Sequence, residues 1–152
     1  MVMARLSLLR APLYPDPAAD QGAHRFTVSL RPGGIAEAIE DGYRQSLPPR
    51  PTRGTPVAPL VTVSDPAVVV EAVKLAEDGS GDLVVRLYEA HGDRSSPTVT
   101  TSIDWQAVEA TDLLEQPVET TALRSSSPRG LELDLRPFEL LTLRFRSPRA
   151  AV

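Results

Sequence analysis

Two carboxylates, an arginine and a histidine lie close together in residues 10–24, the densest group of chemically versatile side chains in the sequence. Asp16, Asp20 and His24 are residue types that act as general acids and bases, or that ligate a divalent metal, when they lie a few ångströms apart. Arg10 adds a donor suited to hydroxyls and carboxylates. The alternative is structural: prolines fix the loop, the aspartates cap turns and His24 begins a strand. Because no glycine-rich phosphate loop, second nearby histidine or known ligand spacing accompanies them, we expect no self-sufficient catalytic site here.

The remaining candidates have equally plain structural explanations. His91 follows a strand-like run that carries Arg86 and Tyr88 on one face, which favours a surface patch over a ligand site. Trp105 is the single tryptophan and is more typical of a partly buried core residue than of a sugar-stacking platform. Residues 125–127 are serines, but no nucleophile elbow surrounds them. The sequence also holds neither a P-loop nor a dinucleotide fingerprint.

Composition restricts the function classes further. The 152 residues carry a net charge of −4 and no basic run, so we expect no nucleic-acid partner. Cysteine is absent, which excludes disulfides, zinc thiolates and cysteine nucleophiles. No run approaches the roughly 18 apolar residues of a membrane span, and the first residues lack a leader pattern, so we expect a cytoplasmic protein with no membrane partner.

Apolar residues recur at every second position in many short runs, a pattern typical of strands with one covered face. The clearest run is residues 24–30, in which Phe26, Val28 and Leu30 share a face. The other runs are residues 6–8, 61–63, 68–75, 83–88, 99–103, 118–123, 131–135 and 141–145. These runs predict an all-β protein, a mostly antiparallel β-sandwich of about nine strands.

Turn residues between these runs predict hairpins. Residues 77–81 read EDGSG, and their glycines suit the positive φ of tight turns, so residues 69–75 should pair with residues 83–89. Residues 92–97 and 125–130 are two further candidate turns, each expected to reverse the chain. Three hairpins in succession indicate a meander or a Greek key.

One segment follows a different period. Apolar side chains recur at every fourth position from Ile35 to Leu47, which predicts a short α-helix over residues 35–47 with a supporting ion pair between Glu40 and Arg44. Pro48 ends this helix.

The helix and the proline-rich stretch after it suggest the domain organisation. Residues 48–57 are rich in proline and read as an extended linker. Residues 1–47 would then be N-terminal strands plus the helix, part of a larger β-sandwich. Residues 58–146 would form the C-terminal antiparallel sandwich, and residues 147–152 a tail.

Several ungapped stretches, in order along nearly the whole chain, resemble the glycoside hydrolase family 38 α-mannosidases, in their bacterial and cytosolic-type branch. The similar stretches are LSLLRAP at residues 6–12, PDPAADQGAHRF at 15–26, VEAVKLAEDG at 70–79, RLYEAHG at 86–92, DLLE at 112–115 and LRPFE at 135–139. Several such blocks together are far more specific than one motif.

The resemblance implies the C-terminal β-sandwich region of a retaining α-mannosidase, which acts on terminal α-mannosides in mannose or glycan metabolism. The family places an aspartate nucleophile and a divalent metal, usually zinc, in a separate N-terminal catalytic domain, and its HxDxxW and HGxGDGGG patterns do not occur here. Neither Asp16 nor Asp20 therefore inherits the role of nucleophile, since the two carboxyl groups that retention requires come from elsewhere. We expect no catalytic residue, no cofactor and no metal in this chain, which alone should be inactive.

The same resemblance suggests how this region contributes to the enzyme. It would support and shape the active site of the catalytic domain in cis, which reaches an α-mannoside glycan. Arg10, Asp16, Asp20 and His24 are candidates for an edge of the substrate site. The sequence departs from the family at residues 30–33, LRPG where LxPH is expected, and at Ser46, where asparagine is expected before LPPR.

Two other classes of function stay open: an independent carbohydrate-binding module, and a small enzyme that uses residues 10–24. Apolar surface left uncovered would also make self-association possible.

Overall fold

The computed structural model describes residues 3–127 and 130–148. The chain divides into two compact units, Met1–Pro32 and Gly33–Val152. No helix of the described residues is long and apolar enough to cross a membrane. The expected domain boundaries at residues 47, 57 and 146 concern a larger enzyme and stay predictions, as does the tail, of which residues 149–152 lie outside the described residues.

The first unit contains no strand within residues 3–32, so the strands predicted at residues 6–8 and 24–30 are wrong. The apolar face expected of the second run is exposed, and Leu30 reaches 92%. Alternation decides which face of a strand is apolar, but a strand also needs a neighbour for its N–H and C=O groups and a core for that face. This unit supplies neither within itself.

The second unit opens with helix α1 (Ile35–Ser46), which confirms the predicted helix. The backbone N–H of Gly34 donates to Glu37 Oε2 at 2.7 Å, which satisfies one of the free donors at the helix start. Glu40 and Arg44 form the expected ion pair at 2.6 Å. The hydroxyl groups of Tyr43 and Tyr88 lie 3.1 Å apart, and this hydrogen bond joins α1 to the sandwich. This hydrogen bond is the largest of the effects that raise the pKa of Tyr43 to about 12, and burial is the second largest.

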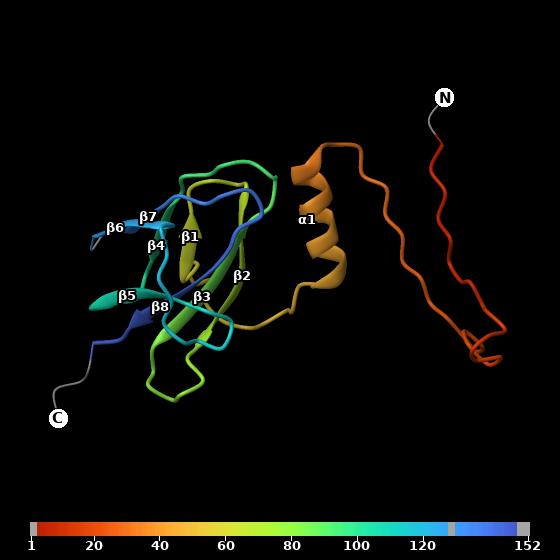
Figure 1. Cartoon of the computed structure of the whole chain (residues 1–152), viewed down its shortest axis with the longest axis horizontal. Coiled ribbons are helices and arrows are strands. Elements are labelled where there is room, and N and C mark those ends of the chain that lie inside the picture. The colour runs from red at the N-terminus through yellow and green to blue at the C-terminus, as the bar shows by residue number, and fades with distance from the viewer. Residues whose placement is uncertain (1–2, 128–129, 149–152) are drawn as a thin grey trace. The chain divides into compact units, whose positions relative to one another are not determined.

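Two antiparallel four-stranded sheets form the rest of the second unit, which confirms the predicted fold class (Figure 1). The first sheet has the order β1 (Val61–Val63), β4 (Thr98–Thr101), β7 (Gly130–Leu133), β6 (Leu123–Ser127). The second has the order β2 (Val68–Leu75), β3 (Leu83–Glu89), β8 (Leu140–Arg146), β5 (Ala107–Thr111).

The core lies between these sheets and is built from the inward side chains of alternating residues. Its most completely buried members are Val85, Leu87, Val99, Leu131, Leu133, Leu135, Leu143 and Phe145. Trp105 packs against this core, its ring 5.6 Å from that of Phe145 in an edge-on arrangement. This is the structural explanation that the sequence favoured for Trp105.

Two of the three predicted hairpins exist. Val69 of β2 pairs with Tyr88 of β3 and the ladder runs to Leu75 and Leu83, as the turn chemistry predicted. Strands β6 and β7 form the second hairpin; residues 128–129 of its turn lie outside the described residues. The third prediction is wrong, because residues 92–97 carry the chain from β3 in one sheet to β4 in the other. A tight reversal and a crossing between sheets use the same turn residues, so sequence alone did not separate them.

One further predicted strand is largely absent, and one observed strand was not predicted. The run at residues 118–123 is not a strand except at Leu123, where β6 begins and continues through serines expected to form a loop. Strand β5 was not predicted, because AVEAT has no clear apolar alternation. Antiparallel pairing with β8 makes this segment a strand, with Ala107 opposite Arg146 and Thr111 opposite Thr142.

Candidate functional site

Asp16, Asp20 and His24 form hydrogen bonds within residues 10–24. Asp16 Oδ1 accepts from the N–H of Ala18 at 2.9 Å, and Asp20 Oδ2 accepts from the N–H of Ala11 at 3.0 Å. His24 Nε2 lies 3.0 Å from the carbonyl oxygen of Asp20. These hydrogen bonds cap turns, as the structural alternative for this loop predicted.

The described residues do not assemble a metal site from these side chains. No group of three or more His, Cys, Asp or Glu residues in residues 3–127 and 130–148 is placed to hold an ion. Arg10, Asp16, Asp20 and His24 are all exposed. Their assignment to a substrate edge stays a prediction, because it concerns a surface that would be completed by another domain.

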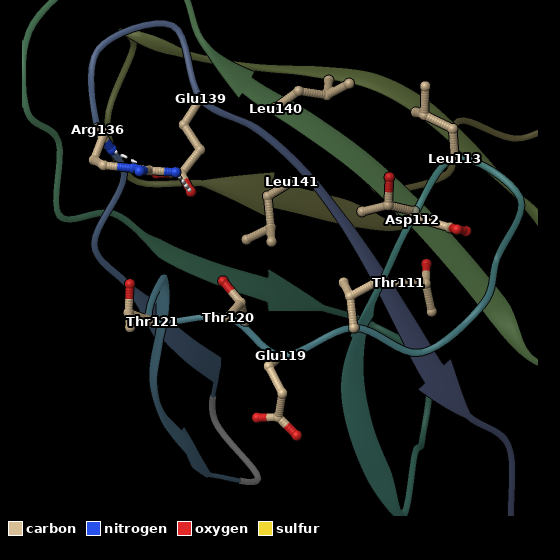
Figure 2. A pocket seen from close by; sticks show the side chains of 12 residues that line it. Thr111, Asp112, Leu113, Glu119, Thr120, Thr121, Arg136, Glu139, Leu140 and Leu141 are labelled. Carbon is tan, nitrogen blue, oxygen red and sulfur yellow. Dashed lines mark hydrogen bonds and ion pairs between the residues drawn. The ribbon is translucent and has the colours of Figure 1, made fainter.

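A pocket of about 580 Å³ lies where β5 leaves the second sheet (Figure 2). Its wall is formed by Thr111, Asp112, Leu113, Val118, Glu119, Thr120, Thr121, Arg136, Glu139, Leu140, Leu141 and Thr142. Three segments of chain supply these residues: the end of β5 with its turn, the returning segment 118–121, and the start of β8 with the loop before it. Sequence patterns did not mark this pocket, because its residues come together only through the sheet.

The turn after β5 opens the pocket. Asp112 Oδ1 accepts from the N–H groups of Leu114 and Gln116 at 2.8 and 2.9 Å, which reverses the chain immediately after Thr111. The N–H of Val118 then donates to the carbonyl of Ala110 at 3.0 Å. Strand β5 therefore ends beside Thr142. Leu140 and Leu141, the first residues of β8, still pair with β3 and also line the pocket.

Polar side chains occur in both the buried and the exposed parts of the pocket wall. Thr111 is 5% exposed, and its hydroxyl is the single fully buried side-chain polar atom without a hydrogen-bond partner in the described part of the chain. Thr142 is also buried, and its hydroxyl oxygen accepts from Arg86 Nε at 3.3 Å. Figure 2 shows Glu119, Thr120 and Thr121 on the side of the pocket opposite Arg136 and Glu139. Arg136 binds Glu139 through Nε and Nη2 at 3.2 and 3.1 Å, so this cation is already neutralised.

A second polar group, Glu89, is completely buried and holds two loops together. Its carboxylate accepts from the N–H groups of His91 at 2.7 Å, Gly92 at 2.8 Å and Phe138 at 3.0 Å. Burial acts to raise the pKa of Glu89, but these backbone hydrogen bonds lower it below its usual range. The residues RLYEAHG and LRPFE, distant in sequence, meet at this carboxylate.

A third polar group ties the β2–β3 turn to the end of β8. Arg144 is buried; its Nε donates to Asp82 Oδ2 at 2.8 Å and its Nη2 to Asp78 Oδ2 at 2.6 Å. Asp82 also accepts from Arg146 Nη1 at 3.0 Å and from the N–H of Ser147 at 2.9 Å. Burial acts to raise the pKa of Asp82, but the hydrogen bonds from Ser147 and the two arginines lower it. Each charge has its partner, so this group serves the fold.

His91 likewise serves the loop after β3. Its backbone N–H donates to Glu89, and the residue is half-buried.

The fold and its polar groups define a β-sandwich domain in which the buried charges hold turns and loops in place and an open pocket lies at a sheet end. The chain belongs to the family described as "Glycosyl hydrolases family 38 C-terminal beta sandwich domain", whose model matches residues 67–143. This confirms the resemblance to family 38 seen in the sequence, whereas the bacterial and cytosolic-type branch stays a prediction.

Individual relatives agree. The chain is 43% identical to mouse alpha-mannosidase 2C1 over 122 residues and 42% identical to the human protein of that name over 124 residues. It is 28% identical to an alpha-mannosidase of Saccharomyces cerevisiae over 150 residues. These alignments cover 73%, 74% and 82% of this chain but only 12%, 12% and 14% of the relatives. The chain thus matches a small part of each relative.

Proposed function

We propose that this chain acts as the non-catalytic C-terminal β-sandwich domain of an α-mannosidase, supporting and shaping an active site carried by another domain of the same polypeptide. The observation that carries this proposal is the family match, which spans the sandwich from before β2 into β8. The buried ionisable groups support it. Glu89, Asp82 and Arg144 are fully used in holding loops and turns, so they are not available for chemistry.

The first unit supports a role in cis. Leu6, Leu8, Phe26, Val28 and Leu30 are exposed apolar side chains in two alternating runs. Alternating runs of this kind pair and become covered when a neighbouring strand and a core are supplied. In this proposal another domain supplies both, and a chain without that domain self-associates through the same surface.

The rest of the assignment follows from the enzyme class. The substrate is an α-mannoside glycan, the zinc or other divalent metal belongs to the catalytic domain, and the compartment is the cytoplasm. Arg10, Asp16, Asp20 and His24 lie at the edge of the substrate site, where their hydrogen-bonding groups contact sugar hydroxyls or brace neighbouring loops.

A segment exchange with the mouse relative tests the proposal. The matching segment of mouse alpha-mannosidase 2C1 is replaced by this chain, and hydrolysis of an aryl α-mannoside is compared with that of the relative lacking the segment. We expect the hybrid to hydrolyse the substrate and the shortened relative to lose most of its turnover. This chain alone should show no hydrolysis. Activity of the isolated chain, or full activity of the shortened relative, would refute the proposal.

A further inference from the structure

The pocket at the end of β5 has hydrogen-bonding capacity that the fold does not use. Thr111 has a buried hydroxyl without a partner, and neither Glu119 nor Thr121 forms a side-chain hydrogen bond or ion pair in the part of the chain that the structure describes. The hydroxyl of Thr142 accepts from Arg86, which leaves its own proton available to donate. A buried polar group without a partner costs stability unless something completes its hydrogen bond.

The charges around the pocket select the class of ligand. Asp112, Glu119 and Glu139 make the wall acidic, and Arg136 is bound to Glu139 in a two-point contact. An anion would therefore meet carboxylates and no free cation. The acidic residues are not grouped to hold a metal ion within the described residues. A neutral ligand rich in hydroxyl groups matches this mixture of donors and acceptors.

The rim suits the less polar face of such a ligand. Leu113, Val118 and Leu140 are exposed apolar side chains at the mouth of the pocket. A pyranose ring carries hydroxyl groups around its edge and C–H groups on its faces, so it would place hydroxyl groups toward the threonines and a C–H face against these residues. The volume of about 580 Å³ lies within the range of roughly 300–1,000 Å³ common for small-molecule pockets.

We propose that this pocket is a saccharide-binding site and that it takes a hexopyranoside. The choice of an α-mannoside as its ligand rests on the proposed function, whereas the ligand class rests on the pocket alone. Rotation of the Thr111 side chain to another staggered position would let a sugar hydroxyl supply the missing partner. Figure 2 shows the Glu119 carboxylate directed away from the other labelled side chains, so it would turn toward the pocket to accept a hydrogen bond from a second sugar hydroxyl. Thr121 would exchange a hydrogen bond with a third hydroxyl.

Amide chemical shifts of this chain, followed by NMR during titration with methyl α-D-mannopyranoside, test the proposal. We expect saturable shifts confined to residues 111–113, 118–121 and 139–142. Glu119→Gln should weaken the apparent affinity about tenfold, because a neutral amide oxygen replaces a charged acceptor. Thr121→Val should weaken it several-fold, because the hydrogen bond of a neutral, exposed hydroxyl is lost. Glu71→Gln is the matched control, since this exposed carboxylate of β2 lies outside the pocket, and its affinity should not change.

A second variant separates a binding role from a structural one. Thr111→Val removes the unpaired hydroxyl while keeping the shape, so the folded chain should resist urea better and yet bind the mannoside several-fold more weakly. Absence of saturable shifts would overturn the proposal, as would unchanged affinity in all three pocket variants. Shifts of these amides by a short apolar peptide and not by the mannoside would overturn it too. If the chain binds no mannoside but restores hydrolysis in the segment exchange, the saccharide site is overturned and the proposed function stands. If the chain binds the mannoside but does not restore hydrolysis, the proposed function alone is overturned.

Discussion

At the scale of single residues, Glu89 shows why a charged side chain lies at the end of a buried strand. Its two oxygens meet three backbone N–H groups, and two of these belong to the loop that crosses between the sheets. Gly92 completes the arrangement, because its φ of 82° and a Cβ position 2.6 Å from the Phe138 ring both exclude a side chain. Phe138 has positive φ, and its side chain is 71% exposed, so packing of the ring does not hold this backbone conformation. The hydrogen bond from its N–H to Glu89 holds it instead.

We expect Glu89→Gln to destabilise the sandwich by about 2 kcal/mol, because a glutamine amide places N–H groups against backbone donors that a carboxylate satisfies. Urea unfolding followed by circular dichroism measures this change. The exposed Glu71→Gln should stay within about 0.5 kcal/mol of the unchanged chain. Equal stability of the two variants would show that the carboxylate is dispensable for the crossing loop.

At the scale of elements, the β2–β3 hairpin is held at two places. Its strands pair along their length, and its turn is tied to β8 by Arg144 with Asp78 and Asp82. The turn sequence predicted the hairpin, whereas the arginine clamp required β8 to lie beside β3. A hairpin turn that is clamped in this way cannot open without breaking a buried ion pair.

Arg144→Met should destabilise the chain by about 3 kcal/mol, because it leaves Asp82 buried with fewer partners. The exposed pair of Arg124 with Asp134, at 3.4 Å, offers a matched comparison, and Arg124→Met should cost less than about 1 kcal/mol. Thermal and urea unfolding of the two variants give the difference. Similar losses from both substitutions would mean that the clamp adds nothing beyond a surface ion pair.

At the scale of the whole molecule, buried and paired carboxylates make the sandwich sensitive to acid. The hydroxyl of Ser95 and the N–H of Ala67 lower the pKa of Asp65, and Arg136 lowers that of Glu139. Asp82 and Glu89 are shifted in the same direction. In the unfolded chain these groups return to ordinary values near 4, so the unfolded state takes up protons first as the pH falls.

The free energy of unfolding should therefore be nearly constant above about pH 5 and should fall as the pH drops through about 4 and below, where the folded state must also protonate these carboxylates. Melting temperatures by circular dichroism between pH 3 and pH 7 give this profile. In the Glu89→Gln variant one of the groups is gone, so the acid slope should be shallower. If stability falls equally steeply with pH in the Glu89→Gln variant and in the unchanged chain, Glu89 does not contribute to the acid sensitivity.

The sequence by itself determined the local features: α1, the alternating strands β2, β3 and β8, the first hairpin and, through its ungapped stretches, the family. Periodicity and turn chemistry are properties of neighbouring residues, so they can be read along the chain. Predictions from the sequence were wrong where a strand depended on a pairing partner, as at residues 24–30 and in β5. Only the tertiary structure decided which sheet each strand joined. It also decided that Glu89 bridges two loops and that Arg144 contacts a turn more than 60 residues away. Finally, it placed Thr111, Glu119 and Thr121 in one pocket. These contacts depend on which strands lie side by side, and pairing between distant segments leaves no periodic trace in the sequence.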